Sequence, residues 1–252
     1  MTDRIFGARK SDIRPSLLVG AAPAVITPVS SAPIVDLRKY CTYVDNQNGS
    51  QCVGEAIANA NWVACKAQGR RGSHVGIYVG ARVRERQRKG DAIPDVGCMP
   101  ADGYDHIVAV GIEPLDERDL NPALLNTTDT WDEALSAKKV PMEFLAPLED
   151  GDLRGLDAAL AAEWPATYTQ DVDDSYQALN SSSPVWGGLK GPSLGKHRQA
   201  IVGRIVVTGV PCILVWGSWG IGWADGGFSY IPEDVFWGCA EEVCVHAGAV
   251  VL

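Results

Sequence analysis

The sequence lacks two features that would direct it to a membrane or to nucleic acid. No apolar run approaches the roughly 20 residues that a membrane-spanning helix requires. Basic residues are in the minority, because 22 Lys and Arg stand against 31 Asp and Glu, which gives a formal net charge of -9. A chain of this sign repels a phosphate backbone. We therefore expect no nucleic-acid partner and no membrane partner.

Cysteine is too scarce, and wrongly spaced, for a disulfide scaffold or a zinc site. The seven cysteines among 252 residues include no C-x-x-C pair, and their odd number leaves at least one thiol unpaired in a monomer. We expect no metal and no cofactor. Cys239 and Cys244 either bridge a C-terminal loop or remain separate buried thiols. An unpaired thiol favours a cytoplasmic location, with secretion or delivery to a host as the alternative.

Apolar residues, in contrast, are abundant: they make up 46% of the chain, enough to bury a core without cross-links. They recur at helical spacing from Val53 to about Gln68, and again over 75–88. Later segments are predicted to be a loop with a short helix at 97–110, a helix at 152–163 capped by Asp150 or Asp152, and strands at 200–207, 211–216 and 227–231. Helices in the first half and antiparallel strands in the second predict an α+β fold.

Cys52 stands at the expected start of the first of these helices, directly after a loop rich in Asn, Gln, Gly and Ser. The positive end of a helix dipole favours the thiolate, which is the nucleophilic form of cysteine. A histidine brought close to it would act as its proton-transfer partner. Position alone leaves a second interpretation open, in which Cys52 is a small buried apolar side chain.

Three segments resemble those of papain-like cysteine peptidases, in particular bacterial and viral members. Residues 44–54, VDNQNGSQCVG, resemble the nucleophile loop, and His197 followed by AIVG at 200–203 resembles the histidine strand. Residues 215–228, VWGSWGIGWADGGF, resemble the family's Asn-Ser-Trp-Gly-x-Gly-Trp-Gly-x-x-Gly-Tyr segment. Together with Asp-Leu-Arg at 36–38, the resemblance extends with gaps from about residue 34 to residue 237.

This resemblance implies a papain-like two-lobed fold, with a helical lobe, a β-barrel-like lobe of antiparallel strands and an active-site cleft between them. The peptidase domain is expected at 35–252, with its helical lobe at about 45–150 and its β lobe at about 165–252. The implied function is that of a cysteine endopeptidase acting on polypeptides. Cys52 forms a thioester with the substrate, and His197 serves as general acid and base.

The resemblance also implies roles for residues around this pair. Gln47, or alternatively Asn46, is expected to donate a hydrogen bond to the oxyanion. Gln47 stands five residues before the cysteine, where the family spacing is usually six, and we favour it for its longer side chain. Ser218 and Trp219 are expected to line or shield the cleft. The other histidines, His74, His106 and His246, have no family counterpart and are expected to be surface or structural residues.

The sequence departs from the family pattern at the position that orients the catalytic histidine. Gly217 occupies this third position of the triad, where the family has Asn, and glycine has no side chain to accept from an imidazole. Ser218 and Gln199 are the nearest polar substitutes. Gln51 also replaces the usual Ser before the nucleophile. The alternative function is therefore a catalytically impaired papain-fold protein that acts as a binding module, and a weaker third option is a transferase or deamidase.

Residues 1–34 contain four prolines and many small residues without helical periodicity, so we expect an extended N-terminal leader. The segment is too short to resemble the large helical propeptide of secreted family members. We expect it instead to lie along the cleft and to inhibit the protein's own site. A position far from Cys52 would contradict this hypothesis.

Overall fold

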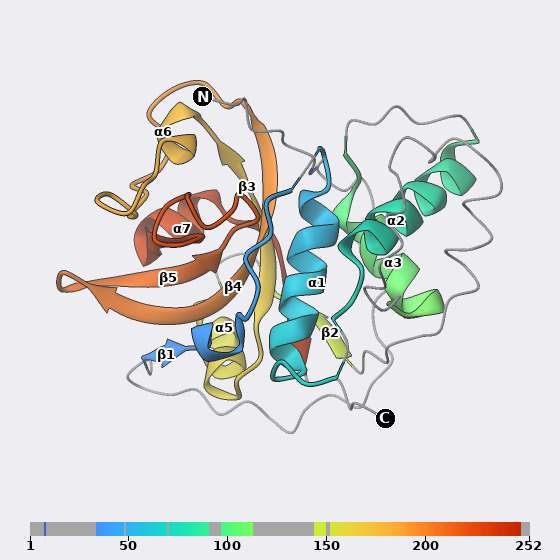
Figure 1. Ribbon diagram of the computed structural model, residues 1–252, viewed down its shortest axis with the longest axis horizontal. Helices are drawn as coiled ribbons and strands as arrows, with labels where there is room; N and C mark the ends of the chain where they lie inside the picture. Colours follow the sequence, from blue (N-terminus) through green and yellow to red (C-terminus); the bar gives the residue numbers. More distant parts are fainter. Residues whose placement is uncertain are drawn as a thin grey trace.

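An antiparallel sheet with several short helices forms one side of the protein, and the helices of residues 52–110 form the other (Figure 1). The computed structural model describes residues 8, 34–47, 49–69, 71–90, 97–112, 144–149 and 152–247. Most of the expected leader therefore lies outside the described residues. No helix within the described ranges is long and apolar enough to cross a membrane.

The sheet has the strand order β2-β7-β3-β4-β5-β6, with β1 paired to β4, and every neighbouring pair is antiparallel. The strands are β1 (Val35–Asp36), β2 (Phe144–Pro147), β3 (Ala166–Val172), β4 (Gly195–Val207), β5 (Val210–Trp216), β6 (Phe228–Pro232) and β7 (Glu241–Ala247). The three strands predicted from the sequence are β4, β5 and β6. Strand β4 begins earlier than predicted, so His197 lies inside it.

The described helices are α1 (Cys52–Ala64), α2 (His74–Lys89), α3 (Pro100–Val110), α5 (Leu153–Ala161), α6 (Asp174–Gln177) and α7 (Glu233–Cys239), with a 3-10 turn at Arg38–Tyr40. Helix α1 lies between the sheet and the pair α2–α3, and it packs along β4 on one side and against α2 on the other (Figure 1). All of its residues are buried. A helix of small and apolar residues suits this central position because it must bury its whole circumference.

Two glycines permit the close approach of the helices. A Cβ atom at Gly54 of α1 would collide with the carbonyl oxygen of His74 at the start of α2. A Cβ atom at Gly80 of α2 would collide with the ring of His106 on α3. These contacts join the three helices into one layered unit that carries Cys52 at its edge.

Helix boundaries differ from the sequence predictions, most clearly in α1 and α3, while α5 ends at Ala161 rather than at 163. Helix α1 ends at Ala64 rather than near Gln68, because Lys66 and Ala67 adopt left-handed φ values of 54° and 56°. Apolar spacing carries no information on such a turn. Helix α3 is a full 11-residue helix with Pro100 in its first turn, longer than the short helix expected there. Helix α5 is confirmed with Asp152 as its N-cap, since the side chain accepts from the Gly155 N–H at 2.8 Å.

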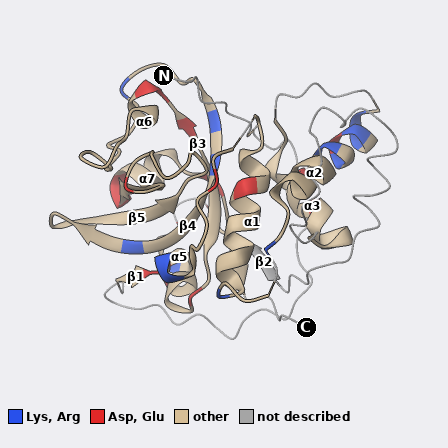
Figure 2. Cartoon of the chain, viewed as in Figure 1, with Lys and Arg blue, Asp and Glu red and all other residues tan. Residues whose placement is uncertain are grey.

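Charged residues are distributed unevenly over these elements (Figure 2). Basic residues gather in the last turn of α2, where they complement the negative end of the helix dipole. Helix α1 carries a single charged residue, Glu55, one turn after Cys52. All seven cysteines are free thiols, and thus Cys239 and Cys244 are not bridged.

Candidate active site

Cys52 is the first residue of α1, and its side chain is fully buried. The preceding Gln51 occupies the N-cap position, but its side chain makes no capping hydrogen bond. The N–H groups of the first helical turn therefore lack the side-chain acceptor that commonly satisfies one of them. This is an environment that favours negative charge at the helix start.

His197 lies in β4, and its ring stacks on the indole of Trp219 with a centroid distance of 4.3 Å and an interplanar angle of 17°. Trp219 in turn meets Trp223 edge-on at 5.1 Å and Tyr176 at 5.7 Å. All four side chains are buried, and His197 is fully so. This aromatic cluster fixes the plane of the imidazole ring.

The loop before Cys52 pairs with the segment that carries Trp219. The Gln47 N–H donates to the Ser218 carbonyl at 2.7 Å, and the Gly220 N–H donates to the Asp45 carbonyl at 2.8 Å. Asn46 forms a bridge with Trp219 between these two bonds. Residues 45–47 and 218–220 thus form a two-stranded unit, which we call the loop ladder.

The Gln47 side chain is oriented by two further hydrogen bonds. Its carbonyl oxygen accepts from the Ser218 hydroxyl, and its Nε2 donates to the Gly49 carbonyl at 3.0 Å. The two ends of the amide are therefore distinguished, with the donor end on the Gly49 side. Asn46 is exposed. Of the two residues predicted to serve the oxyanion, Gln47 is the one whose amide is held in place.

The structure thus links Gln47, Ser218, Trp219 and His197 through direct contacts. Cys52 lies at the start of α1, and this helix packs along β4, the strand that contains His197. The catalytic roles of these residues remain predictions.

At Gly217, the third position of the predicted triad, packing leaves no room for a side chain. A Cβ atom there would lie 2.5 Å from Cζ3 of Trp223, whose ring is fully buried. The two polar substitutes considered from the sequence are engaged elsewhere. Ser218 donates to Gln47, and Gln199 accepts from the Tyr176 hydroxyl at 2.7 Å and donates to the Tyr168 hydroxyl at 3.3 Å.

One residue of the N-terminal leader, Ala8, lies beside this site. Its N–H donates to the carbonyl of Lys196, the residue directly before His197, at 3.2 Å, and it also pairs with Cys98. Ala8 is buried in the same apolar cluster as Cys52. The leader therefore contacts both the helical side and the sheet side close to the predicted catalytic pair.

A buried polar network next to His197 was not foreseen from the sequence. Arg198 is almost completely buried and donates to the Thr169 hydroxyl at 2.7 Å, the Thr167 hydroxyl at 2.8 Å and the Tyr104 hydroxyl at 2.9 Å. Tyr104 on α3 also contacts His246 on β7 at 3.2 Å. The network ties the helices to the sheet, and nothing in the sequence marked Arg198 as buried, because it precedes the apolar run predicted as a strand at 200–207.

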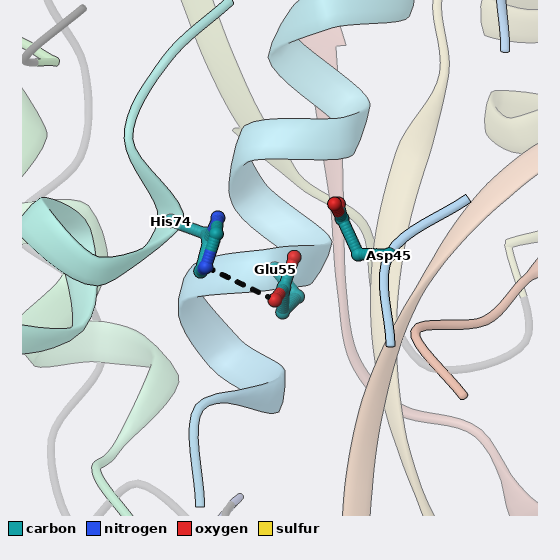
Figure 3. Close-up of side chains that lie close together, drawn as sticks. All are labelled: Asp45, Glu55 and His74. Carbon is teal, nitrogen blue, oxygen red and sulfur yellow. Dashed lines mark ion pairs between the residues drawn. The ribbon is translucent and has the colours of Figure 1, made fainter. Parts of the chain in front are cut away.

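A second unforeseen cluster contains Asp45, Glu55 and His74, whose potential ligand atoms lie within 4.8 Å of one another (Figure 3). His74 Nε2 is 3.3 Å from a carboxylate oxygen of Glu55. The guanidinium of Arg71 bonds both carboxylate oxygens of Asp45 and lies 3.9 Å from Glu55. Arg71 thus supplies the positive charge that a metal ion would bring, and we interpret the group as an ion cluster centred on arginine.

Burial shifts the proton affinity of this cluster. It raises the pKa of Glu55 to about 8, because the carboxylate is desolvated, and it lowers the pKa of Arg71 to about 10. At neutral pH Glu55 therefore mostly holds its proton, while Arg71 stays charged and balances Asp45.

Similarity to known proteins is visible in structure rather than in sequence. No protein-family model matches the chain, and no curated protein is significantly similar to it. Xylellain, a cysteine protease from Xylella fastidiosa, superposes with a TM-score of 0.66 at 18% identity over 99% of both chains. Procathepsin B S9 from Trypanosoma congolense gives a TM-score of 0.66 at 16% identity, over 97% of this chain and 86% of its own.

A third structure, the digestive procathepsin L 3 of Tenebrio molitor larval midgut, gives a TM-score of 0.66 at 16% identity, over 94% of this chain and 75% of its own. All three are cysteine proteases or their precursors by description. The chain therefore has the papain-like two-lobed α+β fold, as expected from the sequence. Identities this low establish the fold and leave the reaction to be argued from the site.

Proposed function

We propose that the protein is a papain-like cysteine endopeptidase with Cys52 as the nucleophile and His197 as the general acid and base. The observation that carries the proposal is the loop ladder. It joins the strand leading into Cys52 to the segment whose Trp219 stacks on His197. One small unit thus connects a cysteine at a helix start with an oriented imidazole, which is the arrangement that thiol catalysis requires.

In this mechanism the Cys52 thiolate attacks a peptide carbonyl, and an S–C bond forms. The C–N bond then breaks as His197 transfers its proton to the leaving amine. Water, deprotonated by His197, attacks the thioester, which releases the acid and restores the thiolate. The Gln47 amide and the Cys52 N–H serve the oxyanion of each tetrahedral intermediate, and one such donor is typically worth about 2.7 to 4 kcal/mol.

Stacking takes over part of the orienting role that Asn has in the family. Gly217 cannot hold the imidazole by a hydrogen bond, but Trp219 restricts the ring to one plane. Because the Asn of the family is replaced by Gly217, we expect slower turnover than a complete triad would give, since orienting groups tune the rate of a nucleophile–base pair.

We further propose that the N-terminal leader inhibits the site in cis. Ala8 bonds to the residue before His197, and both Cys52 and His197 are fully buried in this arrangement. In this proposal a polypeptide substrate competes with Ala8 for the backbone of Lys196, next to His197. Displacement of the leader would then be the activating step.

The first experiment treats the full-length protein with an epoxysuccinyl inhibitor of papain-like enzymes and locates adducts by intact mass and peptide mapping. We expect one adduct, on Cys52, which is absent in Cys52→Ala and strongly reduced in His197→Ala. Hydrolysis of a fluorogenic peptide library should follow the same pattern. Adducts spread over several cysteines, together with no hydrolysis, would favour the binding-module alternative.

The second experiment tests inhibition by the leader. Ala8→Arg places a charged side chain at a position that is 7% exposed, and it should expel the segment and raise the rate of Cys52 labelling at least several-fold. Ile34→Arg is the matched control, because Ile34 is 71% exposed. Equal rates in the two variants would reject autoinhibition without affecting the peptidase proposal.

A further inference from the structure

We propose that Arg71 and Asp45 are positioning residues that hold the Gln47 loop in register with Cys52. This inference rests on the proposed peptidase function and assigns a role to two residues that the resemblance left without one. Asp45 is one of the three residues drawn in Figure 3, and Arg71 donates to its carboxylate.

Arg71 and Asp45 form a contact of defined geometry. Arg71 donates through Nη1 to Asp45 Oδ1 at 3.0 Å and through Nη2 to Oδ2, a two-pronged contact that fixes the carboxylate in plane. Nη2 also donates to the Asn59 side-chain oxygen on α1 at 2.8 Å. The arginine side chain is only 4% exposed. The guanidinium is thus fastened to the helix that carries Cys52.

Asp45 is held at both its side chain and its main chain. Its side chain is held by Arg71, while its main-chain carbonyl accepts from the Gly220 N–H. Gln47 follows only two residues later. Asp45 is therefore the junction between helix α1 and the loop ladder, and a single residue, Asn46, separates it from Gln47.

Further titratable groups surround Arg71 and Asp45. Glu55 of α1 lies 3.9 Å from Arg71 and 3.3 Å from His74 Nε2 at the start of α2. The Tyr43 ring lies 5.0 Å from the guanidinium carbon. Burial raises the pKa of Glu55 to about 8, so at neutral pH this carboxyl does not compete with Asp45 for the arginine. Asp45 is then the main anionic partner of Arg71, which keeps the loop in one position.

The test separates positioning of the oxyanion donor from general damage. Peptide hydrolysis develops an oxyanion, whereas alkylation of Cys52 by iodoacetamide displaces iodide and needs no oxyanion donor. For Arg71→Met and Asp45→Asn we expect kcat to fall roughly 10- to 100-fold, with KM and the alkylation rate within about threefold of the native chain. Arg71→Lys keeps the positive charge but lacks the planar guanidinium, so its kcat should lie between those of the native chain and of Arg71→Met.

Arg82→Lys is the matched control, since Arg82 is also a buried arginine of the helical side and lies over the Tyr78 ring. It should keep the native ratio of kcat to alkylation rate. All variants are compared in the full-length chain, so that any effect of the leader is common to them.

Three results would overturn the inference. In the first, kcat of Arg71→Met stays within twofold of the native value. In the second, kcat and alkylation fall together, which indicates collapse of the site rather than loss of positioning. In the third, the Arg71→Met/Asp45→Asn double variant loses the product of the two single effects, which shows that the residues act independently. Failure of the peptidase proposal looks different, because then the Ala8→Arg chain, in which the leader is displaced, hydrolyses no peptide either.

Discussion

Replacement of Gly217 by Ala or Asn is expected to destabilise the protein rather than to repair its triad. A Cβ atom at this position would lie 2.5 Å from Cζ3 of Trp223. That ring cannot retreat easily, because it is fully buried, contacts Trp219 at 5.1 Å and Tyr176 at 5.3 Å, and donates to the Tyr176 carbonyl at 3.3 Å. Inserting atoms into a packed core costs about 1–3 kcal/mol.

For a chain of this size that cost corresponds to a fall in the melting temperature of about 2–4 °C for each kcal/mol. Urea unfolding followed by circular dichroism would measure the free energy of unfolding directly. Gly222→Ala is the matched control, because nothing lies within 4 Å of a Cβ atom at Gly222, and the change should stay within about 0.5 kcal/mol. If Gly217→Ala behaves like Gly222→Ala, or if Gly217→Asn raises peptide turnover, the packing argument is refuted.

Three further predictions concern buried groups near the site. Burial raises the pKa of Glu55 to about 8. Between about pH 4.5 and 8 the folded chain therefore holds a proton that the unfolded chain has lost. The free energy of unfolding should fall in this range by up to about 1.4 kcal/mol for each pH unit of increase. Glu55→Gln should flatten this slope in urea unfolding across that range, and an unchanged slope would contradict the assignment. Burial lowers the pKa of His246 to about 3, so its contribution has the opposite sign and stability is lost as pH falls below about 6.5. His246→Gln should make thermal unfolding less sensitive to acid between pH 6.5 and 4, and equal acid sensitivity would argue against a neutral buried imidazole. Trp219→Ala removes the stacking partner of His197 and should lower kcat at least 10-fold, whereas Trp219→Phe retains a ring and should lose less; steady-state kinetics that rank the two equally would reject the orienting role.

The sequence was most informative where residues act through short-range spacing. The segment 215–228 pointed to the fold, and the structure stacks its Trp219 on His197 as one cluster. The start of α1 at Cys52 followed from the apolar period and the polar loop before it. These features depend on neighbours in the chain, which a single sequence displays directly.

The parts that sequence could not predict depend on contacts between distant residues. Arg71 and Asp45 are 26 positions apart, and Arg71 belongs to none of the segments that resemble the family. Gly217 and Trp223 lie in the same segment, yet only the folded loop shows that the indole fills the space of a side chain at 217. The early end of α1 depends on left-handed residues that are not glycine, which propensity does not anticipate.

The pairing of Cys52 with His197 is the central claim, and the pH dependence of Cys52 alkylation tests it most directly. Burial raises the pKa of Cys65 to about 11 and those of Cys239 and Cys244 to about 12, so these thiols should react slowly at pH 5 to 7. We expect iodoacetamide to modify Cys52 of the Ala8→Arg variant rapidly and selectively in this range, and Cys52 of the native chain more slowly. In His197→Ala the alkylation rate of Cys52 should rise only at alkaline pH, as it does for an ordinary thiol. If instead Cys52 in the Ala8→Arg variant reacts no faster than the other cysteines at pH 6, or if its profile is the same in His197→Ala, the two residues do not form a catalytic pair.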